Sequence, residues 1–243
     1  MRVLITRPEP SASVTASKLL KIGHTPITFP MSRRECVEIS TQTNLHSASA
    51  FIFTSANAVH CFKNTPISNP ELLSKLTYVV GDKTKGEALK LGFNNIQTGT
   101  GNGQALAELI VRDFNDRQIA PAADTPLIYL TAENRTSDLE ETLAKNKLPV
   151  TPIIIYEMIT HFSQAQFISV LKNNAIDIVL FYSQSAVRRF FAAINNNDPN
   201  LFTSLRYGCL SKEIASAIPD EFSNQIDIAI EPKEHHLLAC IGN

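Results

Sequence analysis

The sequence predicts an α/β protein in which parallel β-sheets are covered by helices and divided between two domains. Three observations predict this fold. Apolar runs of strand length alternate with helical patterns along the chain, and the second half repeats the plan of the first. In addition, 243 residues are long for one ordinary domain but comfortable for two small ones.

Six units, each a strand followed by a helix, account for most of the chain. The expected strands are short apolar runs at 2–6, 50–54, 76–80, 126–131, 177–182 and 206–210. The helices expected after them, in which apolar residues recur three and four apart, are 10–22, 56–63, 82–90, 136–146, 184–193 and 211–218. A further helix is expected near the end of each half, at 103–110 and 234–241.

The clearest internal repeat pairs "FIFTSANAVHCF" at 51–62 with "VLFYSQSAVRRF" at 179–190. In each copy an apolar strand stops at a serine, Ser55 or Ser183, and a helical pattern follows. Serine caps helices well, and the free N–H groups and positive dipole end of a helix start suit a carboxylate or phosphate. The simpler alternative is that the two serines only cap.

Two extended segments, 33–39 and 152–160, lie between the first and second units of the two halves. They could pair as a two-stranded bridge between the domains. Such a bridge would be a hinge with a cleft beside it, where small-molecule sites are usually found. The stretch "DRQIAPAADTP" at 116–126 is expected to be the loop that connects the two halves.

The composition is that of a soluble globular protein. Hydrophobic residues make up 44% and charged residues 19%, and the net charge of -1 argues against disorder and against a general affinity for nucleic acid. The amino terminus does not resemble a signal peptide, and no apolar run approaches membrane-spanning length. A cytoplasmic protein is therefore expected.

Positive charge is concentrated in two segments. Residues 1–35 contain six basic and two acidic residues, and residues 182–212 contain four basic and one acidic residue. If these segments lie together, they would favour an anionic small molecule. The alternative is that the basic residues belong to solvated helix faces.

The four cysteines are far apart in sequence and form no CxxC pair. They are Cys36, Cys61, Cys209 and Cys240. Neither disulfides nor thiolate metal sites are expected from this spacing, and buried, reduced thiols are the prediction. The histidines show no ligand spacing, so no metal is expected.

Nucleotide and hydrolase motifs are missing from the sequence. The stretch "GTGNGQAL" at 99–106 lacks the G-K-[ST] ending of a phosphate loop and does not follow the first strand of a βαβ unit. Its glycine-rich turn could still hold a carboxylate on backbone amides, although a plain loop is the simpler alternative. Neither Ser55 nor Ser183 lies in G-x-S-x-G, so a hydrolase is not supported.

Several stretches, taken in order, make the chain resemble the uroporphyrinogen-III synthase family along nearly its whole length. They are "VLITRP", "FIFTSANAV", "VVGDKT" with "GEALKLGF", "LIYLTAENR", "IIIYEMI" and "VLFYSQSAV". The resemblance implies two flavodoxin-like parallel-sheet domains joined by a two-stranded antiparallel bridge. One domain would comprise 1–33 and 162–243, the other 39–152, and the bridging strands 34–38 and 153–161. The two repeat copies would then lie in different domains, with their strand ends facing a shared cleft.

The resemblance also implies a reaction. Enzymes of this family are lyases of porphyrin and haem biosynthesis that cyclise hydroxymethylbilane, a linear tetrapyrrole octacarboxylate, to uroporphyrinogen III without a cofactor. Loss of the hydroxyl gives an azafulvene, and attack by the substituted carbon of the fourth ring gives a spiro intermediate that recloses with this ring inverted. The uncatalysed reaction gives the type I isomer. The enzyme would mainly fix geometry and bind charge.

The substrate contacts implied by the resemblance lie in turns after strands and at helix starts. They are Arg7, Ser55, Asn57, Asn102, Gly103, Arg135, Ser183, Ser185, Ser211 and Lys212. Short polar side chains and backbone amides would bind acetate and propionate groups, and the three basic side chains would be counter-ions. For each basic residue the alternative is an exposed, unpaired charge.

Tyr156 matches the tyrosine that the family keeps in its bridging strand. Its phenol, with a reference pKa of about 10, is protonated at neutral pH and could donate a proton to the departing hydroxyl. The alternative is an aromatic residue that only packs on the hinge.

One motif departs from the family pattern. Where other members commonly show G-x-x-T in the second half, this chain has "SKEI", with Ser211 for the glycine and Ile214 for the threonine. The first half keeps Gly81 and Thr84. A hydroxyl contact is therefore expected to be absent in the second half, although Ser211 could partly replace it.

Two other classes of protein remain open at this point. One is a hinged two-lobed protein that binds or senses a polycarboxylate without catalysis, because architecture alone implies no reaction. The other is an interaction scaffold with an exposed apolar patch. For the enzyme, the expected state is a monomer with no nucleic-acid or membrane partner and at most transient contact with the enzyme that supplies hydroxymethylbilane.

Overall fold

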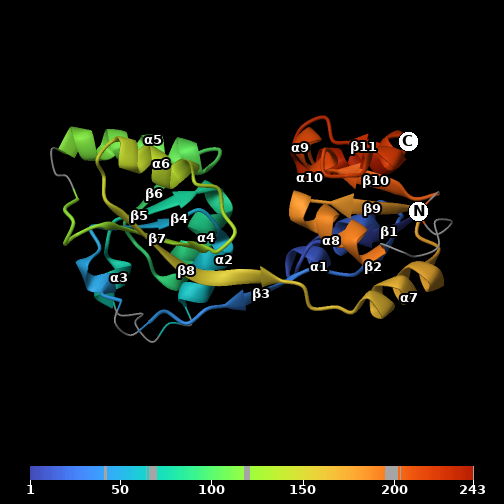
Figure 1. The fold of residues 1–243 in the computed structure, drawn as a ribbon, viewed down its shortest axis with the longest axis horizontal. Helices are drawn as coiled ribbons and strands as arrows, with labels where there is room; N and C mark the ends of the chain where they lie inside the picture. The colour runs from blue at the N-terminus through green and yellow to red at the C-terminus, as the bar shows by residue number, and fades with distance from the viewer. Residues whose placement is uncertain are drawn as a thin grey trace. The chain divides into compact units, whose positions relative to one another are not determined.

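The computed structural model describes residues 1–40, 43–63, 65, 70–117, 121–194, 202 and 204–242. The chain forms two compact units: unit 1 contains Met1–Arg33 and Ile159–Asn243, and unit 2 contains Arg34–Met158. The chain therefore passes from one unit to the other twice. Each unit is built around its own β-sheet (Figure 1).

Unit 1 is built on a five-stranded sheet in the order β11-β10-β9-β1-β2, and all of its strand pairs are parallel. The strands are β1 (Arg2–Ile5), β2 (Thr25–Thr28), β9 (Ile178–Phe181), β10 (Arg206–Cys209) and β11 (Ile226–Ile228). The helices are α1 (Ser11–Lys21), α7 (Gln164–Asn174), α8 (Gln184–Ile194), α9 (Lys212–Ala215) and α10 (Glu234–Ala239), with 3-10 turns η3 (Asp220–Gln225) and η4 (Cys240–Gly242).

Helices bury both faces of this sheet. Along β9, Val179 and Phe181 point into a core shared with α7 and α8, whereas Ile178 and Leu180 point into a second core shared with α1 and α10. Successive strand residues face opposite sides. Because both sides are buried, β9 is apolar at every position instead of alternating with polar residues.

Unit 2 is built on a six-stranded sheet in the order β3-β8-β7-β4-β5-β6, in which the four pairings from β8 to β6 are parallel. The strands are β3 (Arg33–Cys36), β4 (Ala50–Phe53), β5 (Thr77–Val80), β6 (Ile96–Gly99), β7 (Leu127–Ala132) and β8 (Val150–Ile159). The helices are α2 (Ala56–Phe62), α3 (Pro70–Leu73), α4 (Gly81–Leu91), α5 (Gly103–Arg117) and α6 (Asp138–Lys145), with a 3-10 turn η1 (Leu45–Ser47).

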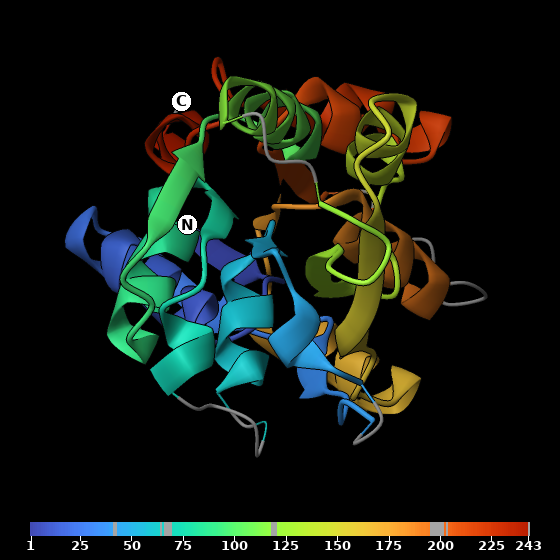
Figure 2. The same ribbon diagram turned by 90° about the vertical axis from the view of Figure 1, so that its left-hand side faces the viewer.

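The sheet of unit 2 is also covered on both faces. Figure 2 shows α5 and α6 together on one face, and the helices α2 and α4 pack on the other. On the α2 side, the rings of Phe51, Phe53, Phe62 and Phe93 pack with centroids 5.6 to 6.5 Å apart. This aromatic cluster fixes the position of α2, whose first turn carries two of the predicted site residues.

The predicted parallel α/β fold is confirmed. Both copies of the repeat form a strand, a polar turn and a helix, as β4 with α2 and as β9 with α8. At the edge of the unit 2 sheet β3 lies beside β8, where the N–H of Val37 donates to the carbonyl of Ile155 at 2.9 Å. The arrows of these two strands point in opposite directions in Figure 1.

Some sequence-based boundaries were wrong. The helix expected at 211–218 is only the single turn α9, because the chain tightens into i to i+3 turns at Ala217 and Ile218 before Pro219. The loop expected at 116–126 lies inside unit 2. Helix α5 occupies its first two positions, and 118–120 lie outside the described residues.

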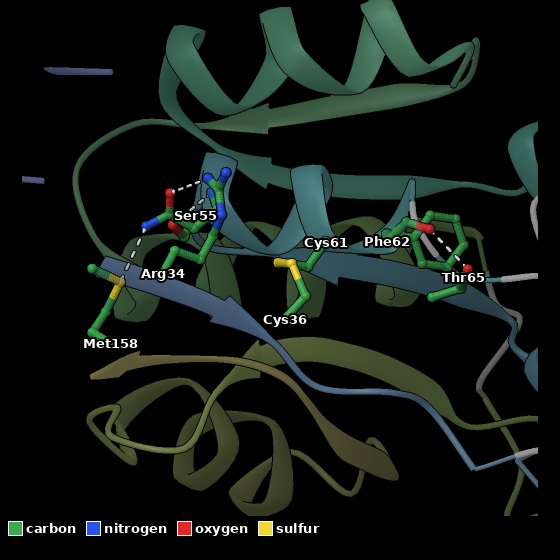
Figure 3. The surroundings of a disulfide bond; sticks show 8 residues. Arg34, Cys36, Ser55, Cys61, Phe62, Thr65 and Met158 are labelled. Carbon is green, nitrogen blue, oxygen red and sulfur yellow. Dashed lines mark hydrogen bonds between the residues drawn. A yellow bond between two sulfur atoms is a disulfide. The ribbon is translucent and has the colours of Figure 1, made fainter. Parts of the chain in front are cut away.

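The prediction that the cysteines form no disulfide was wrong. Cys36 in β3 and Cys61 in α2 are joined by a disulfide with a Cα–Cα distance of 5.4 Å (Figure 3). Cys209 is a buried free thiol and Cys240 is a partly exposed one. Sequence spacing could not reveal the pair, because the two cysteines are 25 positions apart and meet only where the edge strand β3 lies against α2.

Candidate functional site

A pocket of about 250 Å³ in unit 2 brings several predicted residues together. It lies where β4 and β7 end, which is the edge at which parallel α/β sheets place ligands. Four of the predicted residues line it: Ser55, Gly103, Arg135 and Tyr156. The remaining lining residues are Thr54, Tyr129, Thr131, Ala132, Asn134, Thr136 and Leu139.

Ser55 and Asn57 form the turn that starts α2. The hydroxyl of Ser55 accepts a hydrogen bond from the backbone N–H of Asn57 at 3.1 Å, so Ser55 caps the helix as its sequence position suggested. The side-chain oxygen of Asn57 accepts a hydrogen bond from Nη1 of Arg34 at 2.9 Å (Figure 3). Asn57 is thus adjacent to the pocket through Ser55 but is not among its lining residues.

Tyr156 lies on β8 beside Ala132 of the neighbouring strand and is 7% exposed. Burial raises the pKa of its phenol, and the polar side chains of Ser55 and Asn57 oppose this only in part. The phenol is therefore protonated at neutral pH, so it can donate a proton or a hydrogen bond in its resting state.

A second tyrosine in the pocket was not predicted from the sequence. Tyr129 on β7 is 3% exposed, and its hydroxyl lies 2.9 Å from Oγ1 of Thr54. The only sequence signal for it was its place in an otherwise apolar strand, where a tyrosine hydroxyl needs a partner.

Asn102 and Gly103 start the long helix α5. The side-chain oxygen of Asn102 accepts a hydrogen bond from the N–H of Ala105 at 3.0 Å, which makes Asn102 a cap. Gly103 lines the pocket, whereas Asn102 is exposed outside it.

Arg135 already has a carboxylate partner. Its Nε and Nη2 donate to the two oxygens of Glu140 at 3.0 and 2.7 Å, and this hydrogen bonding raises the pKa of Arg135. A substrate carboxylate at Arg135 would therefore have to share the guanidinium with Glu140.

Ser183 and Ser185 lie at the carboxyl end of β9 in unit 1. The hydroxyl of Ser183 accepts a hydrogen bond from the N–H of Ala186 at 3.2 Å and lies 3.1 Å from the hydroxyl of Ser185. Both serines are exposed. Ser183 therefore caps α8, whereas the hydroxyl of Ser185 makes no capping bond.

Ser211 and Lys212 follow β10, the neighbour of β9, and so lie at the same edge of the sheet. Ser211 caps α9 by accepting from the N–H of Ile214 at 3.3 Å. The exposed Lys212 has no ion pair with any residue in the described ranges. Ile214, at the position where the family pattern has threonine, is 8% exposed and packs in the core, so an apolar side chain occupies this position.

Arg7 is also paired. Its Nη1 donates to Glu234 at 2.9 Å, and its guanidinium carbon lies 4.0 Å from the ring centroid of Tyr182. The same carboxylate accepts hydrogen bonds from Thr15, Lys18 and Tyr182. Burial alone would raise the pKa of Glu234, but these partners outweigh it and lower the pKa below its usual value.

The described residues offer neither a metal-binding cluster nor a membrane-spanning helix. Histidine, cysteine, aspartate and glutamate side chains form no group of three that could hold a metal ion in the part of the chain that is described. Nor does any helix of that part combine the length and the apolar character that crossing a membrane requires.

Two parallel α/β units, each with polar turns at the carboxyl edge of its sheet, define a two-unit α/β protein. The model of the family described as uroporphyrinogen-III synthase HemD matches residues 13–239, nearly the whole chain. The chain therefore belongs to the uroporphyrinogen-III synthase family, whose members are lyases of haem biosynthesis.

Solved structures show the same fold. A uroporphyrinogen-III synthetase from Helicobacter pylori superposes with a TM-score of 0.63 at 17% identity, over 99% of this chain and 98% of that one. A mutant uroporphyrinogen III synthase from Thermus thermophilus gives a TM-score of 0.56 at 15% identity, over 99% of this chain and 96% of that one. No curated protein matches the sequence.

Proposed function

We propose that the pocket of unit 2 is the place where the hydroxyl leaves hydroxymethylbilane, with Tyr156 as the proton donor. The observation that carries this proposal is a buried phenol with a raised pKa among polar side chains at the carboxyl edge of the sheet. A phenol that stays protonated at neutral pH can protonate a departing hydroxyl so that it leaves as water. The tyrosinate recovers its proton in the same turnover from the substrate, which loses one as the new ring closes.

The size of the pocket limits what enters it. Sites for whole drug-sized ligands measure roughly 300–1,000 Å³. The pocket, of about 250 Å³, is smaller and suits one pyrrole ring with its substituents. The reactive end of the chain would enter, while the other rings bind elsewhere.

The remaining predicted residues would bind acetate and propionate groups. In unit 2, Ser55, Asn57, Asn102 and Gly103 supply hydroxyl, amide and backbone donors near the pocket, and Arg135 supplies a shared charge. In unit 1 the contacts are Arg7, Ser183, Ser185, Ser211 and Lys212. Among these, Ser185 and Lys212 have the fewest competing contacts, because neither caps a helix nor forms an ion pair with a described residue.

A direct assay tests the function. Freshly prepared hydroxymethylbilane is incubated with the protein, and the oxidised porphyrins are separated chromatographically into the type I and type III isomers. Enzymatic formation of type III, faster than spontaneous closure, is expected. Type I alone at the spontaneous rate would refute the proposal.

We also propose that the protein works as a cytoplasmic monomer and receives its substrate during transient contact with the enzyme that makes it. The support is chemical: hydroxymethylbilane closes spontaneously to the type I isomer, so a short transfer distance reduces loss. Analytical ultracentrifugation tests the monomer. The contact is tested in a coupled reaction that contains the supplying enzyme and this protein. An excess of a catalytically inactive variant of this protein should compete for the supplying enzyme and so raise the type I fraction.

A further inference from the structure

We propose that Arg34 binds a carboxylate of the substrate beside the Tyr156 pocket, an inference that rests on the proposed function of that pocket. Arg34 is the second residue of β3 and is half-buried. It was not among the residues predicted from the sequence to contact the substrate. The structure places its guanidinium at the first turn of α2, where it is hydrogen-bonded to Asn57. Figure 3 shows it beside Ser55.

Arg34 differs from the other two site arginines in its charge balance. Arg7 is paired with Glu234, and Arg135 is paired with Glu140. Arg34 forms no ion pair with a carboxylate in the described part of the chain, and its hydrogen bond goes to the neutral amide of Asn57. A half-buried guanidinium that forms no ion pair is costly to keep, and an anion bound in the working enzyme would complete the site.

The charge of Arg34 acts on groups around the pocket. Burial lowers the pKa of Arg34, while Tyr156 and Glu87 oppose this. The pKa of the exposed His60 is lowered by burial and then by the charge of Arg34. The positive charge of the guanidinium therefore acts on Tyr156 as well as on His60.

The guanidinium also has free bonding capacity. An arginine carries five N–H donors in a planar fork, and among the described residues Asn57 occupies one of them. The bond to Asn57 orients the fork and leaves the other donors for a carboxylate, which guanidinium groups bind in a bidentate manner.

Two links hold the backbone of Arg34 in place. Cys36, two residues after Arg34, forms a disulfide with Cys61 of α2, the helix that carries Asn57. One residue beyond, Val37 donates to Ile155, the neighbour of Tyr156 on β8. Arg34 is thus fixed with respect to both the turn of α2 and the tyrosine, as a binding group needs to be.

The variant Arg34→Gln tests the proposal in steady-state kinetics with hydroxymethylbilane. Loss of a charged hydrogen-bonding group is expected to raise KM about tenfold, with kcat near that of the unchanged enzyme. Arg34→Lys keeps the charge but loses the fork, so an intermediate KM is expected. Arg33→Gln is the matched control, because it removes the same charge from the exposed neighbour on β3.

The outcomes separate this proposal from the proposed function. If the unchanged enzyme forms the type III isomer and Arg34→Gln has the same KM, Arg34 does not bind substrate. A shift confined to the alkaline limb of kcat, with KM unchanged, would mean that Arg34 only acts on Tyr156 and would also overturn the proposal. If the unchanged enzyme forms only type I, the proposed function fails first. Circular dichroism of each variant establishes that it is folded.

Discussion

Cys36 and Cys61 are covalently bonded, which ties the edge strand β3 to helix α2 in unit 2. One of these cysteines is exposed and the other is 1% exposed. The bond therefore reaches from the surface into the aromatic core on the α2 side. It also joins the strand that carries Arg34 to the helix that carries Asn57.

Breaking this bond should destabilise the protein. Closing a loop across 25 residues removes chain entropy from the unfolded state, which corresponds to about 3.5 kcal/mol. Cys36→Ser is expected to lower the free energy of unfolding in urea by about this amount, and Cys240→Ser, outside the bond, should change it little. A thiol titration of the unfolded protein should find two free thiols before reduction and four after it. Four free thiols without reductant would contradict the disulfide.

Replacing Tyr156 by phenylalanine should slow the reaction. General acids contribute about 10²–10⁴-fold to rate, so kcat of Tyr156→Phe should fall by about that factor while the protein stays folded. Tyr207→Phe is the matched control in unit 1, because the buried hydroxyl of Tyr207 has no hydrogen-bond partner among the described residues. Unchanged kcat in Tyr156→Phe would leave this tyrosine with a packing role only.

If Tyr156 is the proton donor, its raised pKa determines how kcat depends on pH. Because burial raises the pKa of Tyr156, the protonated form persists beyond the usual tyrosine pKa of about 10. The kcat of the unchanged enzyme should therefore show no loss from this group until the pH exceeds about 10. An alkaline fall of kcat near neutral pH that disappears in Tyr156→Phe would contradict the raised pKa.

Glu234 should stabilise unit 1 in a pH-dependent manner. Its pKa is lowered in the folded state, so its contribution is full above the unfolded value of about 4.3 and is lost as the pH falls through the folded value. Glu234→Gln should lower the free energy of unfolding by about 2 kcal/mol at neutral pH. The difference from the unchanged protein should shrink as the pH falls below about 4. A difference that does not change with pH would show that the charge of Glu234 is not involved.

Variants of the two serines after β9 should distinguish helix capping from substrate binding. Ser183→Ala removes the cap of α8 and should cost about 1 kcal/mol in urea unfolding. Ser185→Ala removes no cap and should leave stability nearly unchanged, so a rise in KM in this variant would report substrate contact. If neither variant raises KM, the turn after β9 only caps the helix.

The sequence predicted the fold well where its signals are local. The strands β4 and β9 are apolar at every position because both faces of each sheet are buried, and the serines after them start helices as expected. The short strands β2, β6 and β11 were missed, because they are only partly buried and so carry a weak apolar pattern.

At the candidate site, local sequence patterns predicted some features but not the long-range pairings of side chains. The sequence by itself determined the parallel α/β layers and the polar turns at strand ends, because periodicity and capping act over a few neighbouring residues. Tyr156 was singled out by the family resemblance alone. Only the tertiary structure decided which charges are neutralised: Glu234 pairs with Arg7, and Glu140 pairs with Arg135. It also decided that Cys36 meets Cys61 and that Arg34 reaches Asn57. Such pairings depend on how β3 folds back onto α2, and sequence separation carries no information about that distance.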